Sequence, residues 1–71
     1  MKISEEQLKQ SLEELYGYYF NVAREGANKP DDGELSFEEL KAFGAVDAIG
    51  AVYLQCFGGK AMMSLWLEHA Q

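Results

Sequence analysis

The fold is decided by residues 36–59, which read SFEELKAFGAVDAIGAVYLQCFGG. Ser36 and Glu39 have the spacing of a capping box, in which each side chain satisfies a free backbone N–H of the first helical turn. Apolar residues then dominate as far as Gly58 and Gly59, and glycine commonly ends a helix. We therefore predict a helix over residues 36–57, and we expect it to be the longest and most apolar helix of the chain.

This central helix carries apolar residues on two sides. One stripe contains Val46, Ile49, Tyr53 and Cys56 or Phe57, and the roughly opposite stripe contains Leu40, Phe43, Ala51 and Leu54. A helix that is apolar on two sides is usually buried on two sides, so either the flanking helices or a second copy of the chain must cover it. We predict a homodimer whose self-association residues are Val46, Ile49, Gly50, Tyr53, Phe57 and Trp66.

The rest of the chain also predicts helices. Ser4 and Gln7 repeat the capping-box spacing and predict a helix over residues 4–25, with Gly26 as its stop. Its apolar stripe contains Leu8, Leu12, Leu15, Tyr19 and Val22. A short third helix is expected over residues 60–70. Because no segment alternates apolar and polar residues, residues 1–71 are predicted to form one small all-α domain of three helices.

Composition excludes several classes of function. The chain has 12 acidic and 6 basic residues, for a net charge of −6, which disfavours direct binding to nucleic acid and to anionic membranes. The longest stretch without a charge, residues 48–59, is shorter than the about 20 residues of a membrane span. The single cysteine cannot form an intrachain disulfide and suits a reducing compartment, so we expect a cytoplasmic protein. The first residues become acidic before any apolar stretch, unlike a secretory signal peptide.

Residues 28–39, which read NKPDDGELSFEE, contain a loop motif. Asp32, Gly33 and Glu39 stand at positions five, six and twelve of a segment that resembles the calcium loop of the EF-hand family. Asn28 and Pro30 depart from that pattern at positions one and three. The resemblance implies a weakened metal site formed by Asn28, Asp32, Glu34, Ser36 and Glu39. The alternative is a plain turn followed by a helix cap.

Acidic and aromatic residues in the first half predict a surface for a foreign, basic protein partner. A row of carboxylates attracts basic proteins in the way that nucleic-acid phosphates do. Exposed aromatic residues are favoured anchors of interfaces, although they also close the edges of small cores. The predicted partner-binding residues are Glu13, Glu14, Tyr18, Phe20, Asp31, Asp32, Glu34 and Glu38.

No set of nucleophile, base and orienting group can be assembled from the remaining chemical residues. We expect Asp47 to reach solvent or to bond a nearby donor, His69 to be exposed near the C-terminus, and Cys56 to be an inert core thiol. The chain is therefore predicted to be no enzyme and to need no cofactor. The leading prediction is a protein-interaction module of the kind that phages and mobile elements use to inhibit or adapt larger host proteins, including those that handle nucleic acid. The alternative is a calcium-responsive helix–loop–helix protein.

Overall fold

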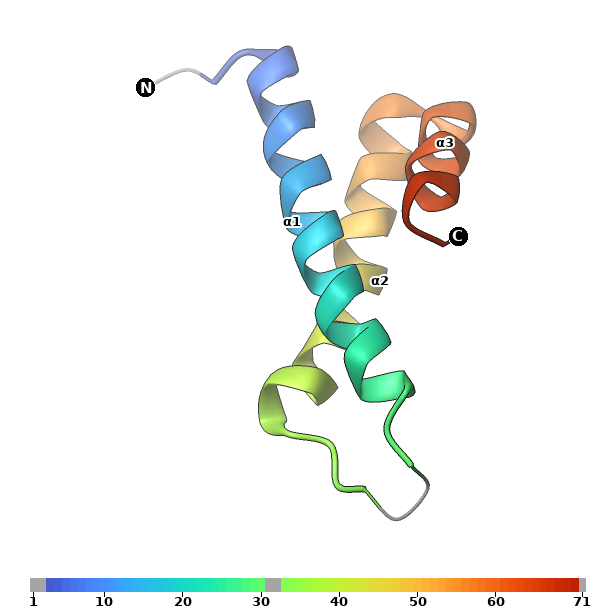
Figure 1. The fold of residues 1–71 in the computed structure, drawn as a ribbon. Coiled ribbons are helices and arrows are strands. Elements are labelled where there is room, and N and C mark those ends of the chain that lie inside the picture. Colours follow the sequence, from blue (N-terminus) through green and yellow to red (C-terminus); the bar gives the residue numbers. More distant parts are fainter. Residues whose placement is uncertain (1–2, 31–32, 71) are drawn as a thin grey trace.

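The computed structural model describes residues 3–30 and 33–70, which form three α-helices. The bounds are Glu5–Ala27 for α1, Phe37–Phe57 for α2 and Gly59–Ala70 for α3. α1 and α2 form a long antiparallel hairpin, and α3 packs at the end of the hairpin that lies away from the connecting loop (Figure 1). The predicted all-α fold is confirmed. The expected order of lengths is wrong, because α1 has 23 residues and α2 has 21.

The helix starts follow the sequence closely. The Ser4 hydroxyl accepts a hydrogen bond from the Gln7 N–H at 3.1 Å, and the Ser36 hydroxyl accepts one from the Glu39 N–H at 3.2 Å. Both capping boxes are complete, since the Gln7 and Glu39 side chains accept in return from the two serine N–H groups. α2 ends where predicted, at Gly58, whose φ of 90° favours glycine because it has no Cβ.

Gly26 has a different role from the predicted helix stop. α1 continues to Ala27, and the Asn28 N–H donates to the Arg24 carbonyl at 3.0 Å. A Cβ atom at position 26 would lie 3.2 Å from both the Glu39 Cβ and the Leu35 Cδ2. Gly26 therefore leaves space for the chain to enter α2 close against the last turn of α1.

The central cluster of the core takes one residue from each helix. Tyr16, Tyr53 and Leu65 are 2%, 2% and 3% exposed, and half-buried residues pack around them. These neighbours are Leu12, Phe20, Val46, Ile49, Phe57, Ala61 and Met62. The predicted stripe of α1 is partly wrong, because Leu8 and Leu15 are exposed. Gly17 and Gly26 are both buried, Gly17 beneath His69 of α3 and Gly26 beneath Leu35 and Glu39 at the entry to α2.

The molecule is elongated and exposes much of its surface. Its radius of gyration is 13.5 Å, whereas a compact domain of this length has about 11 Å. Its solvent-accessible area is 5349 Å², against roughly 4,450 Å² for a compact monomer of this mass. The excess is on the order of 900 Å². The three helices therefore leave more surface open than a compact domain does.

Candidate binding surfaces

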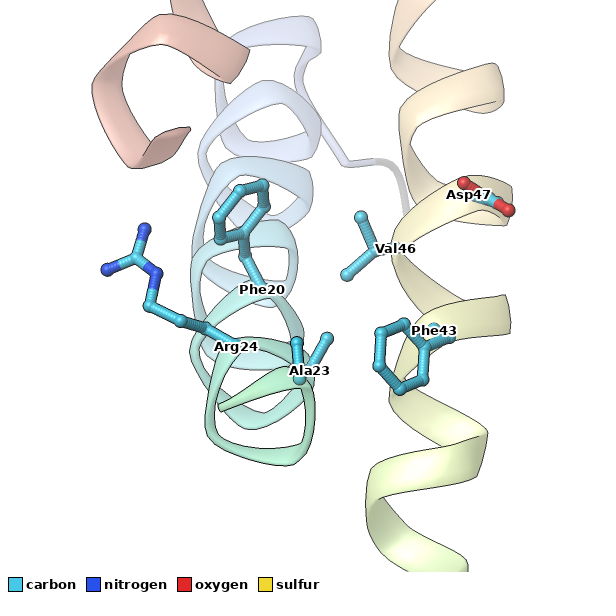
Figure 2. Close-up of a pocket in the computed structure, with 7 residues that line it drawn as sticks. Phe20, Ala23, Arg24, Phe43, Val46 and Asp47 are labelled. Atoms are coloured by element: carbon cyan, nitrogen blue, oxygen red, sulfur yellow. The ribbon is translucent and has the colours of Figure 1, made fainter. Parts of the chain in front are cut away.

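An open groove lies between α1 and α2, and Figure 2 shows Phe20 and Ala23 of α1 facing Phe43 and Val46 of α2 across it. Its volume is about 370 Å³, and it is lined by Phe20, Ala23, Arg24, Ala27, Phe43, Val46 and Asp47. The short side chains of Ala23 and Ala27 leave the space, and the larger apolar side chains form its walls. The groove is a suitable shape for apolar side chains from another molecule.

Charged groups of opposite sign stand at the two rims of this groove. On the α1 side, the Arg24 guanidinium lies 5.2 Å from the centre of the Phe20 ring and also donates to the His69 carbonyl. Arg24 therefore holds the end of α3 against α1. On the α2 side, Asp47 is exposed, as the sequence predicted, and it forms no ion pair within residues 3–30 and 33–70. Its carboxylate is open to a cationic partner.

A second apolar surface lies where α2 meets α3. It contains a hollow of about 470 Å³ lined by Leu54, Gly59, Met62, Met63 and Trp66. Met63 and Trp66 are 57% and 46% exposed. We call this surface, lined by those five residues, the α2–α3 patch. Elsewhere on α2, Leu40 and Val52 are also exposed.

α2 has a further property that the sequence prediction had not assigned to it. By length and composition it is apolar enough to cross a lipid bilayer, and only 11% of its most apolar window is buried. Only one of the two apolar sides of α2 is covered within one chain, so cover of the other side by a second copy stays a prediction. The side with Tyr53 is covered by α1 and α3, and the opposite side is exposed.

The predicted partner-binding residues are distributed over several places. Glu13, Glu14 and Tyr18 meet at a hollow of about 530 Å³ between α1 and α3, where Glu68 and His69 complete the lining with Gln10, Gly17 and Leu65. Phe20 belongs to the groove, and Glu34 and Glu38 are exposed at the opposite end of the hairpin. Asp31 and Asp32 lie outside the described residues. The acidic residues therefore do not form one continuous surface.

His69 is packed more closely than the sequence predicted. Its ring lies 5.8 Å from the rings of both Tyr16 and Phe20, measured between centroids. Its Cε1 atom would be 2.9 Å from a Cβ atom at position 17. His69 is half-buried because Gly17 leaves room for the imidazole on α1.

Most of the predicted self-association residues are used inside the chain. Tyr53 is buried in the core, and Val46, Ile49 and Phe57 pack against the core cluster. Gly50 is half-buried, and its Cβ position lies 3.6 Å from side-chain atoms of Met62 and Tyr16. Trp66 alone of this set is exposed. The stripe of α2 that contains Val46, Ile49 and Tyr53 is therefore covered by α1 and α3 of the same chain.

A buried tyrosine joins the two long helices. The Tyr53 hydroxyl donates to the Glu13 carboxylate at 2.7 Å. Burial, together with this carboxylate, raises the pKa of Tyr53 to about 12. Burial also raises the pKa of Tyr16, and the charge of Asp47 adds to that increase. Both tyrosine hydroxyls are therefore neutral at pH 7.

In residues 28–39, the segment that resembles the EF-hand calcium loop, Lys29 forms an ion pair with Glu39, the residue at position twelve. The Lys29 Nζ lies 2.5 Å from the Glu39 Oε1, which also accepts from the Ser36 N–H at 2.8 Å. These bonds hold the pKa of Glu39 below its ordinary value. Within the described residues, no group of three or more His, Cys, Asp or Glu side chains is placed to hold a metal ion. Asp32 lies outside those residues, and calcium binding by the loop stays a prediction.

Cys56 is exposed, so the prediction of a core thiol is wrong. The core side of the last turn of α2 consists of Tyr53 and Phe57, and Cys56 faces away from it.

Sequence reasoning missed the groove and its lining residues Ala23, Ala27 and Phe43. A signal for it was present, because a third helix over residues 60–70 is about half as long as each of the other two. Such a helix covers only part of the hairpin that it packs on. Which residues face each other across the uncovered part depends on the register of α1 against α2, and the sequence pattern does not specify that register.

Searches for a matching protein family, for related curated proteins and for similar solved structures gave no match.

Proposed function

We propose that this chain acts by protein–protein interaction, as a small non-enzymatic inhibitor or adaptor of a larger partner. The observation that carries the proposal is the excess surface. An accessible area of 5349 Å² exceeds the value for a compact monomer by roughly 900 Å², and one side of a standard interface buries about 800 Å². Within residues 3–30 and 33–70, twelve large hydrophobic residues are exposed, and only four hydrophobic residues are buried. Contact with another protein would cover this surface.

The distribution of charge supports a basic partner. The net charge is −6, and Glu13, Glu14 and Glu68 gather at one hollow beside α3. A cluster of acidic groups attracts a positively charged protein, which raises the local concentration of that protein and speeds its approach. Proteins that handle nucleic acid carry basic surfaces, so they form the partner class that this charge fits. The apolar groove and the α2–α3 patch would then supply the lasting contact.

The α2–α3 patch also supports the predicted homodimer. Residues 42–71 carry a net charge of only −1, so two copies would meet there with little repulsion. We expect sedimentation at micromolar concentration to give a mass near twice 8.0 kDa, and Trp66→Glu to reduce it to that of one chain. A native chain that sediments at 8.0 kDa would remove the homodimer and leave the foreign partner as the proposal.

Affinity capture with matched variants tests the function. Phe43→Ser changes the groove, Trp66→Ser changes the patch, and Leu15→Ser is the control, because Leu15 is an exposed apolar residue of α1 outside both. We expect a partner captured by the native chain to be lost with one or both of the first two variants and retained with the third.

Two results would contradict the proposed function. One is capture of the same proteins by all three variants. The other is flotation of the purified chain with zwitterionic lipid vesicles, since a membrane would then cover the exposed side of α2.

A further inference from the structure

α3 fills only part of the channel between α1 and α2. Its Met62 lies against Gly50 and Tyr16, and its His69 ring lies against Tyr16 and Phe20. The last turn of α3 reaches Phe20 and Arg24, and these two residues also line the open groove, which extends from there along α1 to Ala27. The groove is thus the uncovered continuation of an existing helix-binding surface.

We infer that the open groove binds an amphipathic helix of the partner protein, lying in line with α3. The inference rests on the proposed function, and it names the element and the chemistry that the partner supplies. α3 shows that the channel between these two helices accepts a helix. The α1 side of the groove spans residues 20–27, or roughly 10 Å of helix axis, which corresponds to about two turns. Two turns present apolar side chains at i, i+3 or i+4, and i+7.

The lining of the groove specifies the side chains of that helix. Ala23 and Ala27 leave depth for large anchors such as Leu or Phe, and Phe43 and Val46 are the walls that they would contact. Asp47 stands on the α2 rim with an exposed carboxylate. A Lys or Arg flanking the apolar face of the partner helix would reach this carboxylate, and the overall charge of −6 also favours a basic helix.

A designed peptide probes the groove directly. The probe is a fluorescein-labelled, 14-residue helical peptide with Leu at i, i+3 and i+7 and Lys along one edge, titrated with the full chain and followed by anisotropy. Ala23→Trp would fill the groove, and Ala48→Trp is its matched control on an exposed part of α2 outside the groove. We expect Ala23→Trp to weaken binding at least about tenfold and Ala48→Trp to leave it unchanged.

A second pair of variants keeps the test independent of folding. Phe43→Ala shortens a groove wall and Leu40→Ala is its control, and both side chains are exposed, so neither change should unfold the chain. Asp47→Lys should weaken binding of the Lys-edged peptide about threefold and strengthen binding of the same peptide with Glu in place of Lys.

Several outcomes would overturn the inference. They are failure of both peptides to bind, equal effects of Ala23→Trp and Ala48→Trp, or release of a homodimer by Ala23→Trp, which would make a second copy the occupant. If captured partners are lost with Trp66→Ser and retained with Phe43→Ser, the proposed function stands and the groove is not where the partner binds.

Discussion

The fit of α3 against α1 depends on Gly17, and a glycine-to-alanine comparison can measure this dependence. In a helix interior, replacing Gly with Ala stabilises the fold by about 0.5–1 kcal/mol where there is space for the methyl group. Gly44 has that space, since no atom outside its own stretch of helix backbone lies within 4 Å of its Cβ position. We expect Gly44→Ala to raise Tm by roughly 2–8 °C for a domain of this size.

Gly17→Ala should behave differently, although Gly17 is also helical. The new Cβ would lie 2.9 Å from the His69 Cε1, so the imidazole must move. Its contacts with the Tyr16 and Phe20 rings are each worth about 0.5–1.5 kcal/mol, and their partial loss exceeds the gain in helix propensity. We expect a net loss of about 1 kcal/mol for Gly17→Ala.

A double-mutant cycle separates the collision from other effects. In a His69→Ala background, Gly17→Ala should become stabilising by about 0.5–1 kcal/mol, which gives a coupling energy on the order of 1–2 kcal/mol. Urea unfolding followed by circular dichroism provides all four free energies. The reasoning is refuted if Gly17→Ala stabilises the native chain as much as Gly44→Ala does, or if the coupling is zero within error.

Three further changes test the core, the buried tyrosine and the loop. Leu65→Ala should cost about 2–5 kcal/mol of the roughly 4–10 kcal/mol available to a chain of this length, whereas Leu67→Ala, at an exposed position, should cost less than about 0.5 kcal/mol in the same urea assay. The pKa of Tyr53 is raised from 10.0 to about 12, so the stability that it contributes is present below pH 10 and is lost as the pH rises toward 12. Thermal unfolding should therefore show a steeper fall in Tm over that window for the native chain than for Tyr53→Phe, and equal slopes would contradict this assignment. Calcium at about 1 mM should leave Tm unchanged because Lys29 occupies Glu39; a site with a Kd near 10 μM would instead add about 2.7 kcal/mol, which calorimetry would detect.

Local signals predicted the fold well. Ser4, Ser36 and Gly58 marked helix ends through hydrogen bonds that involve only neighbouring residues, so a sequence pattern carries all the information they need. Gly26 shows the limit of such reasoning. It resembled a helix stop, yet its role depends on Leu35 and Glu39, which reach it only after the chain has turned back.

The binding surfaces were less predictable because they depend on which helix faces are covered. The spacing of Glu13, Glu14 and Tyr18 placed them on α1, but only the position of α3 brings them beside Glu68. Likewise, Phe43 belonged to a recognised apolar stripe, and its position opposite Ala23 follows from the way the hairpin closes. Apolar periodicity identifies faces that need a neighbour, and it does not say whether that neighbour belongs to the same chain.

The link between α2 and α3 has a mechanical consequence. Gly58 is the single residue between the two helices, so rotation about its φ and ψ angles would move α3 as a rigid arm while α1 and α2 stay paired. Such an opening breaks only the contacts of α3, and its free energy is therefore smaller than that of global unfolding. In native-state hydrogen exchange, we expect the amides of α3 to exchange as one cooperative group, ahead of those in the middle of α2.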